Sequence, residues 1–169
     1  MKPLALIESW FKDANNHDYI GVIYLNVDNL QWHNDSWGHD VGDASLARIT
    51  GTIHDIVTPH SDRYLRCGGN EFIVVLYDEQ TKQTFEIADN LRQAIEALQI
   101  KLLHNIAVYQ QYPNQIKQLN SDYLTVSVGA FIQNAKTFAP GSHPLDLPYN
   151  LCTKAKQAGK NQVTKLDMR

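Results

Sequence analysis

The chain has 169 residues, 43% of them hydrophobic, which suffices for one domain that buries a core without disulfides or structural metals. Its formal net charge of −3 gives no broad positive field for duplex nucleic acid, so no nucleic-acid partner is expected. The apolar run Leu4–Ile7 is too short for a signal-peptide core or a membrane span. Cys67 and Cys152 fit neither a CxxC pattern nor a disulfide framework. We expect a cytoplasmic location, either alone or as the cytoplasmic part of a membrane protein.

The first third of the chain predicts a helix, a strand and a second helical region. Apolar residues recur at helical spacing over residues 3–14, which predicts a leading helix within residues 1–18. Residues 19–27, YIGVIYLNV, are β-branched and aromatic without polar alternation, as in a central strand covered on both faces. A helical face then runs from Asp43 until Pro59 stops it.

A β-hairpin is predicted next. Two short strands, at residues 62–67 and 71–77, are separated only by Gly68, Gly69 and Asn70. We expect these three residues to supply the positive φ values of a tight turn.

The rest of the chain continues the alternation of helix and strand. A helix is predicted over residues 82–99 and a strand over 123–132, whose apolar residues alternate on one face. A final helix starts at Pro148 and has Gly159 as its C′ residue, before a last strand at 162–166.

Residues 101–121 have no clean period, and we interpret them as an extended helix end followed by a loop, an atypical extension. No interdomain linker or internal repeat interrupts the chain. We therefore expect residues 1–169 to form one domain.

Five sequence blocks carry a resemblance to a known family. They are LNVDNL, QWHNDSWGHDVGD, RCGGNEF, LTVSVGA and KAKQAGKNQV, in this order along the chain. Together they resemble the GGDEF domain of bacterial diguanylate cyclases, with GGNEF in place of GGDEF. The resemblance implies an α/β (α+β) fold: a five-stranded mixed sheet flanked by helices, similar to the palm of adenylyl cyclases and polymerases.

The resemblance also implies an activity. Domains of this family join two GTP molecules into cyclic di-GMP across a homodimer, with Mg²⁺ or Mn²⁺ as cofactor. The metal-binding positions correspond to Asn26, the backbone carbonyl of Val27, and Asn70. The catalytic positions correspond to Asn70 and Glu71. Because both family carboxylates are neutral asparagines here, the metal site is expected to be weakened.

Other motif positions correspond to GTP contacts. An amide and a carboxylate match the pair that reads the guanine edge, two glycines let the backbone approach the phosphates, and two lysines match the phosphate-binding cations. In that order these residues are Asn34 and Asp43, Gly68 and Gly69, and Lys156 and Lys160.

Two family features are missing. Gln31 stands where the family has a lysine after the first strand. The inhibitory Arg-x-x-Asp motif that binds the product is replaced by Pro59-His60-Ser61-Asp62, which lacks the arginine. Product inhibition through that site is therefore not expected.

Structural interpretations compete with these assignments. Asn70 is also an ordinary turn residue, and Asp28 is either a solvated surface acid or part of the site. Without the resemblance, Lys156 and Lys160 would be assigned to the solvated face of a helix.

Three functions remain open. The first is a catalytically impaired regulatory module that binds GTP or a protein, within cyclic di-GMP signalling. The second is an active diguanylate cyclase. The third is a structural dimerisation domain that binds no nucleotide. Sensor or phosphodiesterase domains in a longer parent protein are further expected partners.

Overall fold

A single mixed β-sheet forms the centre of the molecule. The structure, a computed structural model, describes residues 2–105, 111, 113–137 and 143–169. Its strands are ordered β2-β3-β1-β4-β5, and neighbours are antiparallel except β4 and β5, which are parallel. The expected five-stranded mixed sheet is confirmed. The strands are β1 (Tyr19–Val27), β2 (Tyr64–Arg66), β3 (Glu71–Tyr77), β4 (Val126–Asn134) and β5 (Val163–Met168).

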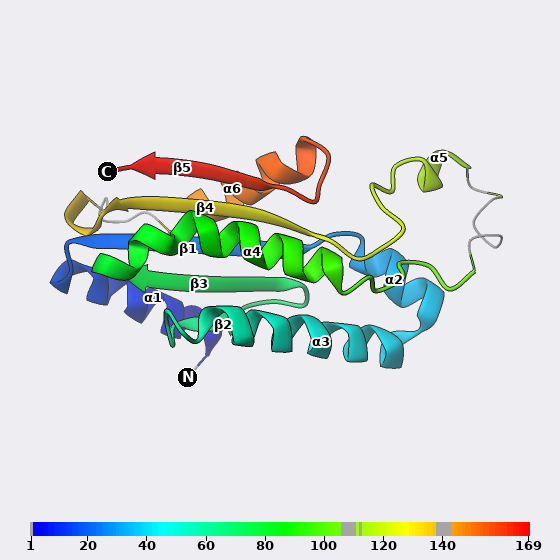
Figure 1. The fold of residues 1–169 in the computed structure, drawn as a ribbon, viewed down its shortest axis with the longest axis horizontal. Helices are drawn as coiled ribbons and strands as arrows, with labels where there is room; N and C mark the ends of the chain where they lie inside the picture. The colour runs from blue at the N-terminus through cyan, green and yellow to red at the C-terminus, as the bar shows by residue number, and fades with distance from the viewer. Residues whose placement is uncertain (1, 106–110, 112, 138–142) are drawn as a thin grey trace.

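Helices cover both faces of this sheet (Figure 1). Two long helices, α3 and α4, lie on one face, and α1 and α6 lie on the other. The short helices α2 and α5 lie beyond one end of the strands. The bounds are α1 (Pro3–Asp13), α2 (Leu30–Trp37), α3 (His39–Val57), α4 (Thr84–Ala97), α5 (Pro113–Ile116) and α6 (Asp146–Gln157), with 3₁₀ turns at Ala14–Asn16, Asp78–Gln83 and Ala135–Thr137.

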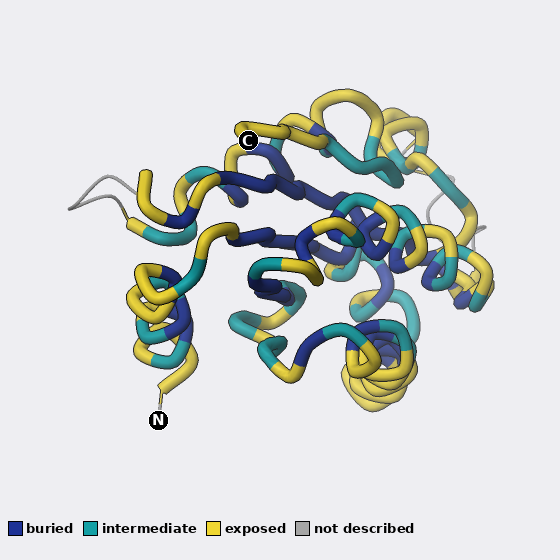
Figure 2. The backbone as a smooth tube through the Cα atoms, turned by 60° about the vertical axis from the view of Figure 1, so that its left-hand side comes forward, coloured by how far each residue is buried: buried dark blue, intermediate teal, exposed yellow. Residues whose placement is uncertain are grey.

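The alternation of side chains along β1 divides the core into two layers. Ile20 and Val22 pack with α1 and α6, whereas Ile23, Leu25 and Val27 pack with α3 and α4. Buried residues accordingly line the three central strands, β1, β3 and β4, and exposed residues lie on the outer sides of the helices (Figure 2). The continuous apolar run of residues 19–27 is explained by this burial on both faces.

Close packing of α6 on β4 depends on Gly129. A Cβ atom at this position would lie 2.6 Å from the backbone nitrogen of Cys152 and 2.7 Å from Cβ of Leu151. Only the absence of a side chain lets the helix approach this near. The approach brings α6 close to the end of β1, where the site described below is built.

The hairpin between β2 and β3 differs from its prediction. Strand β2 is shorter than residues 62–67 and ends before Cys67. Neither glycine of the turn nor Asn70 has a positive φ. Gly68 instead leaves room for the carboxylate of Glu71: a Cβ there would lie 2.3 Å from Oε2 of Glu71.

The prediction of an extended helix end after residue 99 was wrong. Helix α4 ends at Ala97, and Lys101 instead makes an isolated β-bridge with Tyr123. Further along the extension a short helix, α5, forms at Pro113–Ile116, and residues 106–110 and 112 lie outside the described part of the chain. Two backbone bonds, Leu102 N–H to Asp122 O and Leu124 N–H to Ile100 O, close the base of the extension at 2.8 Å each.

Smaller differences concern element ends. Helix α6 begins at Asp146, so Pro148 lies in its first turn, and Gly159 follows the helix with a φ of +125° as predicted. No helix in the described ranges is long and apolar enough to cross a membrane.

Candidate nucleotide site

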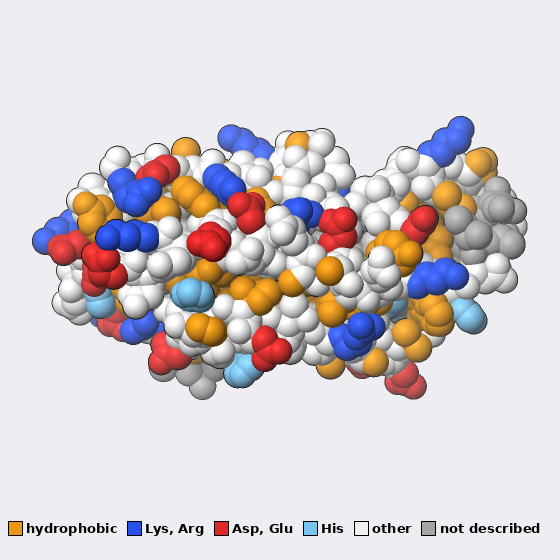
Figure 3. All heavy atoms as spheres, in the orientation of Figure 1, with side chains coloured by type: hydrophobic (Ala, Val, Ile, Leu, Met, Phe, Trp, Pro, Cys, Tyr) orange, Lys and Arg blue, Asp and Glu red, His pale blue; other side chains and the backbone are white. Residues whose placement is uncertain are grey.

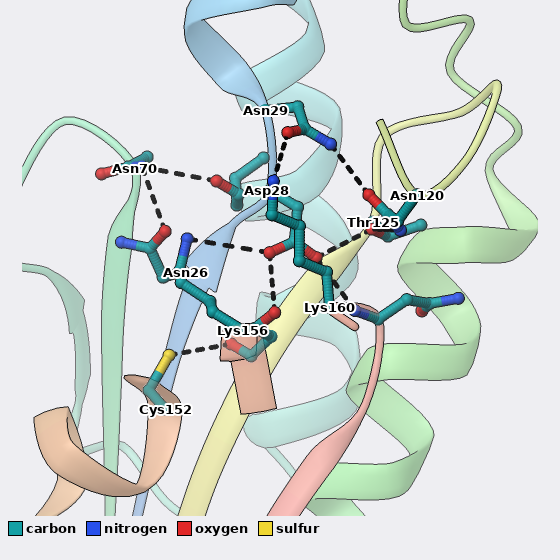
Figure 4. Close-up of polar contacts among 12 residues, drawn as sticks. Asn26, Asp28, Asn29, Asn70, Asn120, Thr125, Cys152, Lys156 and Lys160 are labelled. Atoms are coloured by element: carbon teal, nitrogen blue, oxygen red, sulfur yellow. Dashed lines mark hydrogen bonds and ion pairs between the residues drawn. The ribbon is translucent and has the colours of Figure 1, made fainter. Parts of the chain in front are cut away.

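The predicted site residues gather where β1 ends. Register places Asn26 directly opposite Glu71 of β3 on one side and Ser127 of β4 on the other. The turn before β3 carries Asn70 to the end of β1, and the first residues after β1 lead into α2. Side chains from β1, from α6 and from the segments next to the strand ends therefore gather in one small region (Figure 4).

Asn70 is bonded to the end of β1 through both its backbone and its side chain. The backbone N–H of Val27 donates to the carbonyl of Asn70 at 2.9 Å. In return, Nδ2 of Asn70 donates to Oδ1 of Asn26 at 3.2 Å and to the carbonyl of Val27 at 3.4 Å. A backbone carbonyl only accepts hydrogen bonds, so its contact requires the NH₂ group of Asn70 on this side. We call these three residues the amide clasp.

Asp28 is a buried, fully engaged carboxylate and not a solvated surface acid, with only 1% of its surface exposed. Its Oδ1 accepts a bond from the hydroxyl of Ser127 at 2.7 Å and lies 3.7 Å from Nζ of Lys156. Its Oδ2 accepts bonds from the hydroxyl of Thr125 at 2.8 Å and from the backbone N–H of Asn161 at 3.1 Å. Such complete pairing is what makes burial of a charge tolerable.

A chain of polar contacts continues from Asp28 to the extension. Nζ of Lys160 donates to Oδ1 of Asn29 at 2.6 Å, and Nδ2 of Asn29 donates to Oδ1 of Asn120 at 2.8 Å. The amide of Asn120 then donates to the hydroxyl of Thr125 at 3.2 Å, which is itself bonded to Asp28. Both predicted lysines therefore point into the site and are not on a solvated helix face (Figure 4).

Glu71 lies on the α6 side of the sheet among groups that stay uncharged. Burial, followed by hydrogen bonding to Glu71 and its charge, raises the pKa of Tyr24 well above its ordinary value. Burial also raises the pKa of Cys152 to about 12, against the opposing effect of Lys156, and its Sγ donates to the carbonyl of Ser127 at 3.2 Å. The thiol and the phenol are therefore neutral at physiological pH.

The turn that carries Asn70 is braced by Arg66. Its Nε donates to the carbonyls of Gly68 and Gly69 at 3.0 and 3.1 Å, and its second nitrogen donates to Gly69 at 2.5 Å. A guanidinium group suits this task because its donors lie in one plane. Arg66 thus fixes the conformation of Gly68 and Gly69, and neither glycine adopts a left-handed backbone conformation.

A hollow of about 360 Å³ lies between α2 and this turn. Asn34 and Gln31 line it from α2, and Gly69 and Asn70 line it from the turn. The full lining is Leu30, Gln31, Asn34, Asp35, His39, Gly69 and Asn70. The hollow therefore joins a predicted guanine-reading residue to the predicted metal and phosphate positions.

Asn34 carries a buried Oδ1 atom that has no hydrogen-bond partner among the residues that the structure describes. The atom lies against Gly42, where a Cβ would be only 1.8 Å away. Asp43, the other predicted guanine-reading residue, is the exposed neighbour of Gly42 and does not line the hollow. An unsatisfied buried acceptor of this kind is energetically costly.

The base of the extension is attached to α2, the helix that carries Asn34. Nε1 of Trp37 donates to the carbonyl of Lys101 at 3.1 Å, and the ring of Trp37 lies 4.3 Å from that of His104. The backbone N–H of His104 donates to the hydroxyl of Ser36 at 2.7 Å. The contacts of residues 101–104 thus explain how an irregular segment is ordered beside the site.

The residues at the predicted metal position do not fit Mg²⁺. That ion prefers oxygen ligands, with carboxylates supplying charge, in near-octahedral geometry. Here the oxygens of Asn26 and Val27 are neutral, and both accept bonds from the Asn70 nitrogen. The carboxylate of Asp28 is already engaged. Among the residues that the structure describes, no three His, Cys, Asp or Glu side chains are grouped so as to hold a metal ion.

Comparison with solved structures identifies the class of fold. The active GGEEF domain of a diguanylate cyclase from Vibrio cholerae superposes with a TM-score of 0.69 at 18% identity, covering 97% of this chain and 96% of that one. The GGDEF domain of DgcB from Caulobacter crescentus, in complex with c-di-GMP, superposes with a TM-score of 0.66 at 20% identity, covering 95% and 85%. This likeness establishes a GGDEF-type fold.

Sequence comparison then establishes the family. The model for "Diguanylate cyclase, GGDEF domain" matches residues 4–162, so this chain belongs to the GGDEF domain family. The diguanylate cyclase DosC of Escherichia coli K12 is 34% identical over 82 residues, 48% of this chain and 18% of that protein. The probable diguanylate cyclase DgcT of the same strain is 28% identical over 147 residues, 87% of this chain and 29% of that protein. The chain thus spans less than a third of the length of either relative.

Several residues of the site escaped sequence reasoning. Arg66 lies two residues before the glycine pair, and its place in the RCGGNEF block was the available signal. Asn29, Asn120 and Tyr24 carried no local signal, because their roles depend on partners far away in the sequence.

Proposed function

We propose that this domain is a guanine-nucleotide-binding regulatory module of cyclic di-GMP signalling whose diguanylate cyclase activity is impaired. One observation carries the proposal: the amide clasp replaces the carboxylate pair that the family uses to hold divalent metal. Asn34, Lys156 and Lys160 of the nucleotide-binding pattern remain around it, whereas Gln31 replaces the family's lysine after the first strand.

The loss of two negative charges explains why nucleotidyl transfer is expected to be impaired. Transfer of a nucleotidyl group from a triphosphate needs a divalent metal to neutralise and orient the phosphates. A unit negative charge placed about 4 Å from a divalent ion contributes roughly 8 kcal/mol of attraction at an effective dielectric of 20, before desolvation, and this attraction is lost with the charge. Asn26 and Asn70 remove two such charges. An amide at position 70 also cannot accept a proton from an attacking hydroxyl.

Guanine binding has separate support. Asn34 lines the hollow, and the exposed carboxylate of Asp43 follows Gly42 on the adjoining helix. An amide with a carboxylate complements the donors and acceptor of a guanine edge. The assignment of this pair rests on the family pattern.

The direct test measures two quantities on one preparation. We expect the chain to bind GTP in calorimetry and to release cyclic di-GMP far more slowly than an intact family member under the same Mg²⁺ or Mn²⁺ conditions. Asn34→Ala or Asp43→Ala should abolish the GTP signal. A cyclase rate equal to that of an intact member would establish the active enzyme instead.

Restoring the carboxylates provides a second arm of this test. We expect the double variant Asn26→Asp with Asn70→Asp to gain cyclase activity over the parent, since both charges return to the metal position. If neither it nor the parent forms product while GTP still binds, some other change limits catalysis. Absence of GTP binding in every protein would favour a purely structural domain.

We further propose that the domain acts within a longer protein, because its curated relatives extend well beyond the matched segment. Pairing into a homodimer belongs to the family's reaction and is proposed here only for a catalytically competent state. The two free thiols suit a location in the reducing cytoplasm.

A further inference from the structure

The nitrogen of Asn70 lies where two potential metal-ligating oxygens converge. It donates to Oδ1 of Asn26 and to the carbonyl of Val27, so the electron-rich atoms of this position already face a positive N–H dipole. The position is partly enclosed, since Asn26 is only 9% exposed. A cation entering here would have to break both hydrogen bonds and would gain only neutral ligands.

We propose that the amide clasp substitutes for the divalent cation, so that the nucleotide site is ordered, and binds its guanine nucleotide, without divalent metal. The nucleotide part of this statement rests on the proposed function. The clasp itself does not, because it is made entirely by residues of this chain.

Neighbouring groups strengthen the inference. Of the two carboxylates closest to the clasp in sequence, Asp28 is engaged by four donors, and Glu71 lies with its Oε2 atom close to Gly68. Positive charge is instead supplied by Lys156 and Lys160, which lie inside the site. These ammonium groups are parts of the protein, so their charge does not depend on bound metal.

Replacing Asn70 by aspartate should have an effect that the same replacement of an exposed asparagine does not have. Replacing Asn70 by aspartate turns the donor into an acceptor that faces two other oxygens. Without metal, this arrangement leaves the oxygens of Asn26 and Val27 unpaired and repelling a carboxylate. With metal, the same three oxygens become ligands. Asn70→Asp is therefore expected to convert a metal-indifferent site into one that requires Mg²⁺.

Thermal unfolding of the 169-residue chain tests the clasp without any nucleotide. The parent, Asn70→Asp, Asn70→Ala and the double variant Asn26→Asp with Asn70→Asp are melted in EDTA and in millimolar MgCl₂. Asn15→Asp serves as the matched control, since it makes the same chemical change at an exposed residue.

The expected pattern is specific. The parent and Asn15→Asp melt at the same temperature in both buffers. Asn70→Asp and the double variant melt lower in EDTA, by roughly 3 °C or more, and recover in MgCl₂. Asn70→Ala melts lower in both buffers, because it loses the donor without gaining a metal ligand. If Asn70→Asp does not fold in EDTA, the proposal is tested by comparing how MgCl₂ changes the melting temperatures of the parent and of the double variant.

Two results would overturn the proposal. One is a parent whose melting temperature rises in MgCl₂ as much as that of the double variant. The other is Asn70→Asp behaving as Asn15→Asp does in EDTA.

Calorimetry with GTP tests the nucleotide part. The affinity of the parent should be the same in EDTA and in MgCl₂, whereas that of the double variant should tighten in MgCl₂ by at least about tenfold. A parent that binds GTP only in MgCl₂ would overturn metal independence. A parent that binds GTP in neither buffer would overturn the proposed function, while the melting data would still decide the clasp.

Discussion

Single residues at this site are defined by partners that lie far away in the sequence. His33 is 1% exposed and bridges two segments: its Nδ1 donates to the carbonyl of Leu102 at 3.0 Å, and its Nε2 lies 2.8 Å from the hydroxyl of Ser45. Burial lowers the pKa of His33, and backbone hydrogen bonds from the extension partly oppose this effect. The residue next to it, Asn34, depends on this packing for its position.

The lowered pKa of His33 predicts how stability changes with pH. The unfolded chain takes up a proton near pH ~6.5, whereas the folded chain does so only at lower pH. The contribution of neutral His33 is therefore complete above pH ~6.5 and is lost as the pH falls below that value. We expect the free energy of unfolding, measured with urea, to fall more steeply on acidification in the parent than in His33→Gln. His39→Gln, at an exposed position, is the control, and equal slopes in the parent and His33→Gln would contradict the argument.

Elements meet closely at positions where a side chain would not fit. Gly129 on β4 lies against the backbone of α6, and Gly51 on α3 has no atom within 4 Å of a Cβ position. The two glycines thus separate the effect of packing from that of helix propensity.

Alanine at these two positions should act in opposite directions. Gly129→Ala is expected to destabilise the chain by about 1–3 kcal/mol or more, because the clashing atom is backbone and cannot rotate away. Gly51→Ala is expected to stabilise it by about 0.4–1 kcal/mol through higher helix propensity. Urea unfolding of both variants measures these changes. An unchanged Gly129→Ala would mean that α6 moves freely relative to β4.

The whole molecule is two apolar layers that share one sheet. Ile7 of α1 belongs to one layer and Ile53 of α3 to the other, and both are at most 1% exposed. Charged side chains are not segregated by sign on the surface: on the face of α3 and α4, acidic and basic side chains are interspersed (Figure 3).

Because the sheet joins the layers, we expect one cooperative unfolding transition. Ile7→Ala and Ile53→Ala should each cost about 2–5 kcal/mol, and the double variant should lose the sum within about 0.5 kcal/mol. Circular dichroism and tryptophan fluorescence followed in the same urea titration check this. Separate midpoints for the two probes would show that the layers unfold independently.

Periodicity along the chain was enough to predict the order of strands and long helices, because burial on one or both faces leaves a regular apolar pattern. It failed where order depends on tertiary contacts. Residues 101–105 have no period of their own and are ordered through α2. The glycine pair suggested left-handed turn geometry, but the turn is held by Arg66 with Gly68 leaving room for Glu71.

The sequence by itself determined the family and the two amide substitutions, since motif blocks and residue types are local properties of the chain. Only the tertiary structure decided that Asn26 and Asn70 bond to each other, and that Asp28 is buried and paired with Lys156. Both outcomes depend on the distance and orientation of groups from separate strands and helices. These quantities arise when β1, the hairpin turn and α6 pack together, and no spacing along the chain encodes them directly.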